Sequence, residues 1–156
     1  MLCQLLHRCC LLYTSTKLAQ PDVAVVNNAG TAHIGEVGSR EGIARAKGEI
    51  YEGLAQDGIA IINADDGYAD YWKSLNKNRK IITFGLTDIA DVSASYQTRG
   101  NLTQIHLKTP NGEAPFELHV LGLHNVHNAL AASAVAVALG IPNADIATGL
   151  AGFRCV

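Results

Sequence analysis

Apolar residues along the chain fall into short runs and helical repeats that turn-forming residues separate. Val23 to Val26 is a four-residue apolar run, and residues 58–62 and 80–84 are two further runs of the buried-strand type. Between these runs, residues 43–54 carry apolar side chains at helical spacing, and residues 68–76 are expected to form a second, shorter helix. Strands that alternate with helices in this way predict a parallel sheet with right-handed crossovers.

The period of the pattern changes to two between residues 91 and 120. Alternation of apolar and polar residues predicts antiparallel strands with one open face, and Asn111-Gly112 predicts a hairpin turn between the last two strands. Residues 125–139 are nearly all Ala, Val and Leu, which predicts a largely buried helix, and residues 145–150 predict a last one. We therefore predict an α/β fold with three layers, in which helices flank a mostly parallel sheet and residues 91–120 add a small antiparallel sheet.

Composition limits the class of protein and the partners that it can have. The chain has 156 residues, of which 48% are hydrophobic and 17% are charged, so it can form one globular domain with a substantial core. The formal net charge of −2 gives no electrostatic basis for binding nucleic acid or an anionic membrane surface. We expect small-molecule ligands, no nucleic-acid or membrane partner, and a monomer.

The cysteines lie only near the two ends of the chain. Three of them fall within the first ten residues, and Cys155 is the penultimate residue. A body without cysteines needs no disulfides and is typical of a reducing, cytoplasmic setting. The first 19 residues have neither the unbroken apolar run of a signal peptide nor paired ligands at zinc-site spacing. We expect residues 1–19 to be a non-native or disordered end and residues 20–156 to be the folded body.

The least ordinary chemistry lies in residues 27–51, which follow the first strand. Ser39 is placed to cap the helix that comes next, and Lys47 falls on the apolar face of that helix. A buried ammonium without a partner is costly in free energy. Lys47 must therefore extend to water, pair with a carboxylate such as Glu41 or Glu49, bind an anion, lose its proton, or be chemically changed.

His33 lies in the loop between that strand and that helix. A lone histidine in a glycine-rich loop can serve simply as a local hydrogen-bonding residue. In open α/β sheets, however, the loops at the carboxyl ends of the strands are where ligands bind. His33 and Lys47 are therefore candidate site residues, and both simpler interpretations remain open.

A second candidate site lies at the start of the long apolar helix. Asn125 and Asn128 are three residues apart and share one helical face. An amide side chain offers a donor and an acceptor together, which is the pattern that an adenine edge needs. The alternative is a helix N-cap and an amide that is satisfied within the helix start.

These segments together resemble the central domain of the Mur ligases. The resemblance rests on residues 27–51, on the Asn-Ala-Asp-Asp run at residues 63–66 and on GLHNVHNALAA at residues 122–132, in that order. The helix sequence GSREGIARAKGEI is similar to that of the members that add D-alanyl-D-alanine. The resemblance covers about residues 20–153.

The resemblance implies roles for individual residues. In these ligases the residue that matches Lys47 is carbamylated by CO₂, and the residue that matches His33 is a ligand of Mg²⁺. A carbamate would remove the positive charge of Lys47, the candidate catalytic residue, and supply the hard oxygen ligands that Mg²⁺ prefers. The matching asparagines of the family lie by the ATP site, which assigns ATP binding to Asn128 first and then to Asn125 and His124.

The reaction implied by the resemblance is ATP-dependent amide formation in bacterial peptidoglycan precursor synthesis. A phosphoryl group passes from ATP to the carboxylate of UDP-MurNAc-tripeptide, and the amine of D-alanyl-D-alanine then attacks the acyl phosphate. The implied cofactors are ATP and Mg²⁺, and the implied location is the bacterial cytoplasm.

The chain departs from the family pattern at the phosphate-binding loop. It contains no G-x₄-G-K-[ST] sequence. Residues 30–35 have the glycine spacing of this loop, but Glu36 stands where the loop has its lysine. We expect residues 20–156 to be an incomplete central domain, without the phosphate loop and the C-terminal domain, and the isolated fragment to be inactive. The alternatives are an inactive nucleotide-binding remnant or another relative, either a different Mur ligase or a folylpolyglutamate synthetase.

Overall fold

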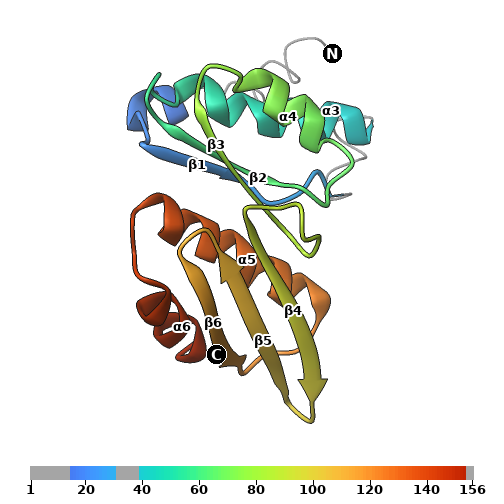
Figure 1. The fold of residues 1–156 in the computed structure, drawn as a ribbon. Coiled ribbons are helices and arrows are strands. Elements are labelled where there is room, and N and C mark those ends of the chain that lie inside the picture. Colours follow the sequence, from blue (N-terminus) through green and yellow to red (C-terminus); the bar gives the residue numbers. More distant parts are fainter. Residues whose placement is uncertain (1–14, 31–38, 154–156) are drawn as a thin grey trace. The chain divides into compact units, whose positions relative to one another are not determined.

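The computed structural model describes residues 15–30 and 39–153 (Figure 1). It confirms the predicted α/β class, with a six-stranded mixed sheet in which the strands follow chain order. Contacts within the chain group it into two compact units, Met1–Ile81 and Ile82–Val156.

The first unit is built around two parallel strands. Val23 lies opposite Ile59 and Val26 opposite Ile62, so the carboxyl ends of the two strands lie side by side. Strand β3 carries the chain from the first unit into the second. The elements of this part of the chain are β1 (Val23–Val26), α3 (Arg40–Gly48), the 3₁₀ helix η1 (Glu49–Gly53), β2 (Ile59–Asn63), α4 (Ala69–Leu75) and β3 (Lys80–Gly85).

Helices α3 and α4 are joined through Trp72, which is completely buried. Its indole Nε1 donates a hydrogen bond to the backbone oxygen of Ala44 at 2.9 Å. Gly48 makes room for this packing, since a Cβ at that position would lie 3.0 Å from Leu75 Cδ1 and 3.3 Å from Trp72 Cδ1. The expectation of one continuous α-helix over residues 43–54 is wrong, because residues 49–53 form a 3₁₀ helix. The α-helix ends at Gly48, and a separate 3₁₀ helix, η1, follows it directly.

Tyr51 ties η1 to the two parallel strands. Its ring is buried, and its hydroxyl donates to the backbone oxygen of Ile61 at 2.8 Å. Burial raises the pKa of the Tyr51 hydroxyl well above its usual range, and a hydrogen bond with the backbone of Val26 partly offsets this rise. The folded state therefore favours the neutral phenol of Tyr51 over the phenolate.

Residues 15–19 form a short helical segment that contacts the rest of the first unit. Thr16 is buried, and a Cβ placed on Gly53 would lie only 2.3 Å from the backbone carbon of Thr16. Contact with the folded body thus begins before residue 20, where we expected the body to start. Residues 1–14, most of the expected non-native end, lie outside the described residues.

The second unit is an antiparallel sheet covered by two helices. Residues Phe84 and Gly85 of β3 pair in parallel with the start of the next strand, and the following three strands pair antiparallel, as predicted for residues 91–120. These elements are β4 (Val92–Arg99), β5 (Leu102–Thr109), β6 (Gly112–Leu118), α5 (Leu123–Ala138) and α6 (Asn143–Ala151).

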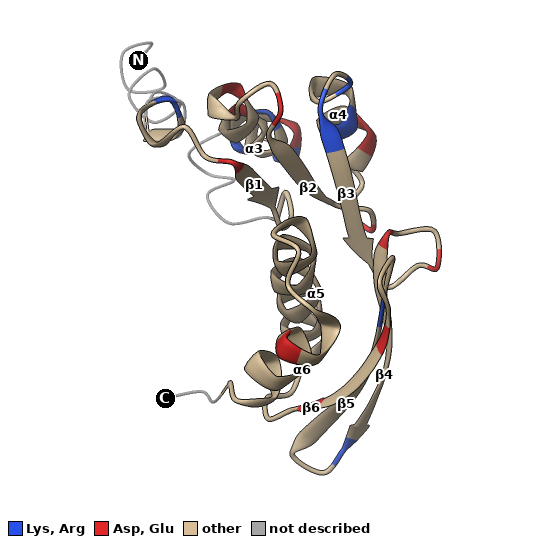
Figure 2. Ribbon diagram, turned by 60° about the vertical axis from the view of Figure 1, so that its left-hand side comes forward, with Lys and Arg blue, Asp and Glu red and all other residues tan. Residues whose placement is uncertain are grey.

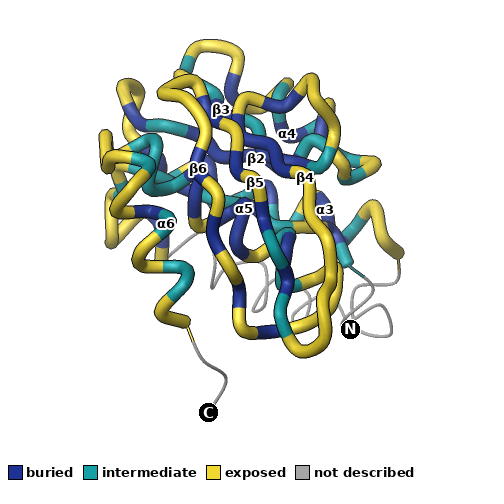
Figure 3. Tube along the Cα trace, turned by 60° about the horizontal axis from the view of Figure 1, so that its bottom comes forward, coloured by how far each residue is buried: buried dark blue, intermediate teal, exposed yellow. Residues whose placement is uncertain are grey.

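One face of this antiparallel sheet forms the core of the second unit. Ile105, Leu107 and Phe116 are buried, whereas the residues that alternate with them are mostly exposed (Figure 3). Helix α5 contacts β4 and β5, α6 contacts β6, and α5 carries no Lys, Arg, Asp or Glu (Figure 2). Within the described ranges, no helix is both long and apolar enough to cross a membrane.

Candidate functional site

The carboxyl ends of β1 and β2 carry a cluster of polar groups. The Asn63 side chain donates from Nδ2 to the backbone oxygen of Asn27 at 2.8 Å, and its Oδ1 accepts from the backbone N–H of Asp65 at 2.9 Å. Asn63 is buried, so these contacts fix the two strand ends relative to each other.

Asp66 extends this cluster to the start of α4. Its Oδ2 accepts a hydrogen bond from the backbone N–H of Ala29 at 2.7 Å, and its Oδ1 accepts one from the backbone N–H of Tyr68 at 2.9 Å. The sequence singled out Asp66 only as part of the Asn-Ala-Asp-Asp run that carries the family resemblance. The spacing to Tyr68 is the local signal of an Asx turn, but the bond to Ala29 joins positions 37 residues apart and has no local signal.

Helix α3 places Lys47 beside the end of β1. Ser39 caps the helix as predicted, because its Oγ accepts from the backbone N–H of Gly42 at 3.0 Å. Lys47 is half-buried, and its Nζ donates to the backbone oxygen of Asn28 at 2.7 Å, with Asn28 Oδ1 at 3.5 Å. The alternative partner Glu41 binds Arg45 instead, at 2.6 Å.

The oxygen atoms around Lys47 bear on whether Mg²⁺ could bind here. The backbone and side-chain oxygens of Asn28 are hard donors of the kind that Mg²⁺ prefers. The ammonium form of Lys47 only donates hydrogen bonds and would repel a cation, whereas a carbamate would offer further oxygens. The donor set therefore fits Mg²⁺ when Lys47 is carbamylated. His33 lies outside the described residues, and the described residues contain no group of three or more His, Cys, Asp or Glu side chains that could hold a metal.

The second candidate site brings His124, Asn125 and Asn128 together in the first turns of α5. The helix begins at Leu123 with Gly122 as its N-cap, so neither asparagine is the N-cap of the simpler interpretation. The Asn125 amide is nevertheless satisfied within the helix start, as that interpretation expected. Asn125 Nδ2 donates back to the carbonyl oxygen of Leu121 at 2.8 Å.

Gly122 allows the turn that presents this helix start. Its φ is +104°, in the region that favours glycine, and a Cβ there would lie 2.7 Å from His124 Cε1. The His124 ring therefore lies over Gly122 in the space that a side chain would fill. His124 and Asn128 are both exposed, so a ligand could reach this end of α5.

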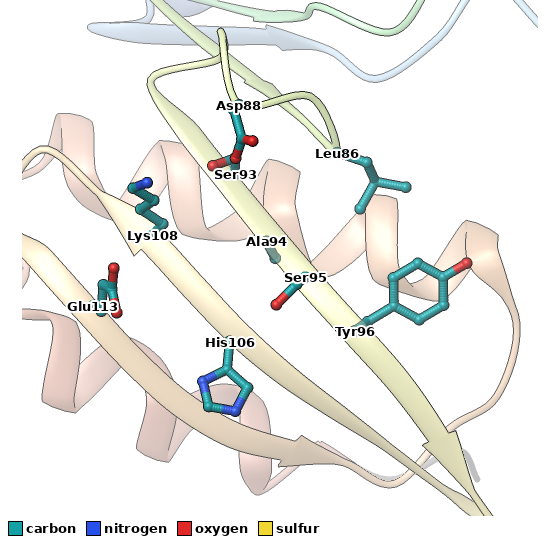
Figure 4. A pocket seen from close by; sticks show the side chains of 9 residues that line it. All are labelled: Leu86, Asp88, Ser93, Ala94, Ser95, Tyr96, His106, Lys108 and Glu113. Carbon is teal, nitrogen blue, oxygen red and sulfur yellow. The ribbon is translucent and has the colours of Figure 1, made fainter.

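A separate concavity of about 550 Å³ lies on the second unit, at the antiparallel sheet (Figure 4). None of the predicted site residues lines it. Its walls come from the loop after β3 and from strands β4, β5 and β6, so sequence reasoning on motifs gave no indication of it.

Comparison with known proteins defines the class of this α/β chain. The family model "Mur ligase middle domain" matches residues 11–136. The chain belongs to the Mur ligase middle-domain family. The matched stretch begins before the boundary that we expected at residue 20.

Three relatives illustrate the likeness. The UDP-N-acetylmuramoyl-tripeptide–D-alanyl-D-alanine ligase of Haemophilus influenzae is 40% identical over 136 residues, which are 87% of this chain and 29% of that protein. A crystal structure of MurF from Acinetobacter baumannii has a TM-score of 0.88 at 37% identity, covering 93% of this chain and 32% of that one. The MurF ligase from Thermotoga maritima, crystallised in complex with ADP, has a TM-score of 0.78 at 26% identity, covering 92% and 33%. The chain thus spans about a third of the length of these relatives.

Proposed function

We propose that this chain works as the central domain of an ATP-dependent ligase that joins D-alanyl-D-alanine to UDP-MurNAc-tripeptide. Membership of the Mur ligase middle-domain family supports the ligase class. The names of the relatives, which are UDP-N-acetylmuramoyl-tripeptide–D-alanyl-D-alanine ligases at 40% identity and below, support the amine substrate. The proposal places the protein in peptidoglycan precursor synthesis in the bacterial cytoplasm.

The observation that carries the proposal is the placement of Lys47. A capped helix holds this lysine beside the carboxyl end of a parallel strand, where α/β proteins bind ligands. The contact with Asn28 orients the side chain, and no carboxylate of the described residues pairs with it. CO₂ could react at this Nζ to give an anionic carbamate.

The roles of the site residues follow from this placement. Lys47 as carbamate and His33 would hold Mg²⁺, which, when bound, would stabilise the negative charge of the transferred phosphoryl group. The half-buried stem of Lys47 and the bond to Asn28 restrict where the carbamate oxygens can lie.

Asn128, Asn125 and His124 would bind the adenine end of ATP. The bond from Asn125 Nδ2 to Leu121 fixes the amide plane of Asn125, so its Oδ1 is left to accept from an adenine amino group. ADP in the Thermotoga maritima relative supports a nucleotide ligand for this family.

A second candidate function is nucleotide binding without turnover, and the sequence favours it for these 156 residues taken alone. No G-x₄-G-K-[ST] loop occurs among them, and backbone groups of such a loop supply most contacts to nucleotide phosphates. Catalysis therefore requires the phosphate contacts to come from residues beyond these 156.

A panel of amine substrates tests the proposal. The full-length ligase that carries this domain is incubated with ATP, Mg²⁺, UDP-MurNAc-tripeptide and one amine, and the product is identified by mass spectrometry. D-alanyl-D-alanine should give product and release of inorganic phosphate, whereas single amino acids should give neither. The proposal would be overturned if a single amino acid gave as much product as D-alanyl-D-alanine. It would also be overturned if phosphate release did not depend on UDP-MurNAc-tripeptide.

A further inference from the structure

The concavity on the second unit lies at the open edge of β4. Four consecutive residues of this strand, Ser93 to Tyr96, line it. Successive side chains of a strand point to opposite faces, so a cavity lined by four in a row must straddle the edge of the strand. The parallel pairing between β3 and β4 ends at Gly85 and Ser93, which leaves the edge beyond Ser93 without a partner strand in the described chain.

Charged side chains of both signs lie around this edge. Lys108 on β5 lies opposite Ser93 on one side and opposite Glu113 on the other. Asp88 comes from the loop after β3 and lies beside Ser93, while Lys108 and Glu113 stand on the neighbouring strands (Figure 4). Within the described part of the chain, the side chains of Asp88, Lys108 and Glu113 make no hydrogen bond or ion pair with the protein.

The loop that carries Asp88 is fixed at its base. Asp91 Oδ2 accepts from the backbone N–H of Thr83 at 2.8 Å and from its hydroxyl at 2.7 Å, and Thr83 Oγ1 accepts from the backbone N–H of Asp91 at 3.0 Å. These three bonds close the loop between the two residues. Asp88 is thereby presented to the concavity by a defined turn.

We propose that this concavity binds a small zwitterion, namely an amino acid or a short peptide with a free ammonium and a free carboxylate. The carboxylate pairs with Lys108, and the ammonium pairs with Asp88 on the other side of the buried Ser93. A simple anion is repelled by Asp88 and Glu113, and a simple cation is repelled by Lys108, so a ligand with both charges is favoured over either.

Leu86 and Tyr96 form the remaining wall of the concavity. Leu86 and Tyr96 lie beyond the β4 edge, on the side away from Lys108 (Figure 4). They offer apolar contact to a short side chain. The proposed site uses none of the residues assigned above to ATP or Mg²⁺, so its ligand binding can be tested without ligase activity.

Amide NMR of the full 156-residue chain tests this site, with glycylglycine as the probe. We expect saturable shifts in residues 86–96 and 104–113, with a Kd of about 1–10 mM, as befits a small ligand in an open site. N-acetylglycylglycine and glycylglycinamide each keep one charge and should bind at least about tenfold more weakly, since one charge pair is lost in each.

Matched variants separate the two charges. Lys108→Gln should weaken glycylglycine but not glycylglycinamide, whose affinity should stay the same or rise because the repulsion by Lys108 is gone. Asp88→Asn should weaken glycylglycine but not N-acetylglycylglycine, for the corresponding reason. Lys77→Gln and Asp57→Asn, which remove exposed charges outside the concavity, are the controls and should bind like the parent chain. Equal affinity for all three probes, shifts confined to other residues, or no saturable shift would overturn the proposal.

Discussion

The ammonium of Lys47 lies 2.7 Å from the backbone carbonyl oxygen of Asn28, which is 19 residues earlier in the chain. This hydrogen bond links the last turn of α3 to the loop that follows β1. It resolves the question that the sequence raised about a lysine on an apolar helix face. The stem of Lys47 is half-buried on the helix, and the backbone of Asn28 holds its head at a strand end.

Asp66 should contribute more to the free energy of unfolding than an ordinary turn residue, because its carboxylate accepts two backbone hydrogen bonds. Asp66→Ala removes both acceptors of the bonds from Ala29 and Tyr68. Hydrogen bonds to a charged group contribute about 1.5–3 kcal/mol each, and the two contributions are not fully additive because both bonds go to one carboxylate. We therefore expect the free energy of unfolding to fall by about 2–4 kcal/mol. Urea denaturation measures the loss. Asp70→Ala is the control, because the Asp70 side chain is almost fully exposed and should change stability by less than about 0.5 kcal/mol. Equal losses in the two variants would show that Asp66 is an ordinary turn residue.

Tyr51 should make stability depend on pH in the alkaline range. Because burial raises the pKa of Tyr51 in the folded state, its contribution is fully present below the ordinary tyrosine value of about 10 and is lost as pH rises above it. Between pH 8 and pH 11 the parent chain should lose about 1.4 kcal/mol of unfolding free energy relative to Tyr51→Phe. Urea denaturation of both proteins at the two pH values gives this difference, and a difference independent of pH would contradict the assignment.

The contact between Gly53 and Thr16 tests whether residues 15–19 belong to the fold. Gly53→Ala forces a Cβ against the backbone of Thr16 and should lower the free energy of unfolding by about 1–3 kcal/mol. The same substitution should have little effect in a chain that starts at Gln20, because the clashing segment is gone. Gly67→Ala, where a Cβ meets nothing within 4 Å, is the control. An equal loss in the long and short chains would mean that the segment does not pack on the body.

The isolated chain should bind ATP weakly and should not hydrolyse it. It contains no G-x₄-G-K-[ST] loop, so the adenine contacts at the start of α5 would have to supply the affinity alone. We expect a Kd for ATP·Mg²⁺ of about 1 mM or weaker by isothermal titration calorimetry, which corresponds to a binding free energy no more favourable than about −4 kcal/mol. Asn128→Ala should remove what binding there is, and a micromolar Kd for the parent chain would contradict this prediction.

The parts of the fold that the sequence predicted well are those with local signals. Val23 to Val26 is the first strand as expected, Ser39 caps α3, and the turn before Gly112 joins β5 to β6. Apolar runs, capping residues and Asn-Gly turns each act within a few residues, so the chain can be interpreted one segment at a time.

The features that the sequence did not predict depend on distant partners. A glycine stands at position 48 because Trp72 and Leu75 of α4 occupy the space beside it, and no signal near Gly48 reveals them. Asp66 accepts from Ala29 across 37 residues, and Lys47 finds Asn28 rather than a carboxylate. The concavity at the β4 edge arises from strand pairing, which brings Asp88, Ser93, Lys108 and Glu113 together without a shared motif.

His33 and Lys47 should act through one metal ion. In the full-length ligase, His33→Ala should raise the Mg²⁺ concentration needed for half-maximal rate. The double variant with Lys47→Ala should lose less transition-state stabilisation than the sum of the single losses, because both side chains serve the same ion. Steady-state kinetics over a Mg²⁺ series measures this coupling, and strictly additive losses would argue for separate roles.

The most direct test of the account is the ligation rate of the full-length ligase with Lys47→Ala. We predict a loss of at least about 10²-fold in kcat, with an unchanged melting temperature and partial rescue by added formate or acetate, because a small carboxylate can fill the space of the lost carbamate. Arg45→Ala is the matched control on the same helix, since the Arg45 side chain is exposed and its ion pair in the described structure is with Glu41. A near-normal rate in Lys47→Ala, with at most a small loss of stability, would show that Lys47 is an ordinary surface lysine and would contradict the account.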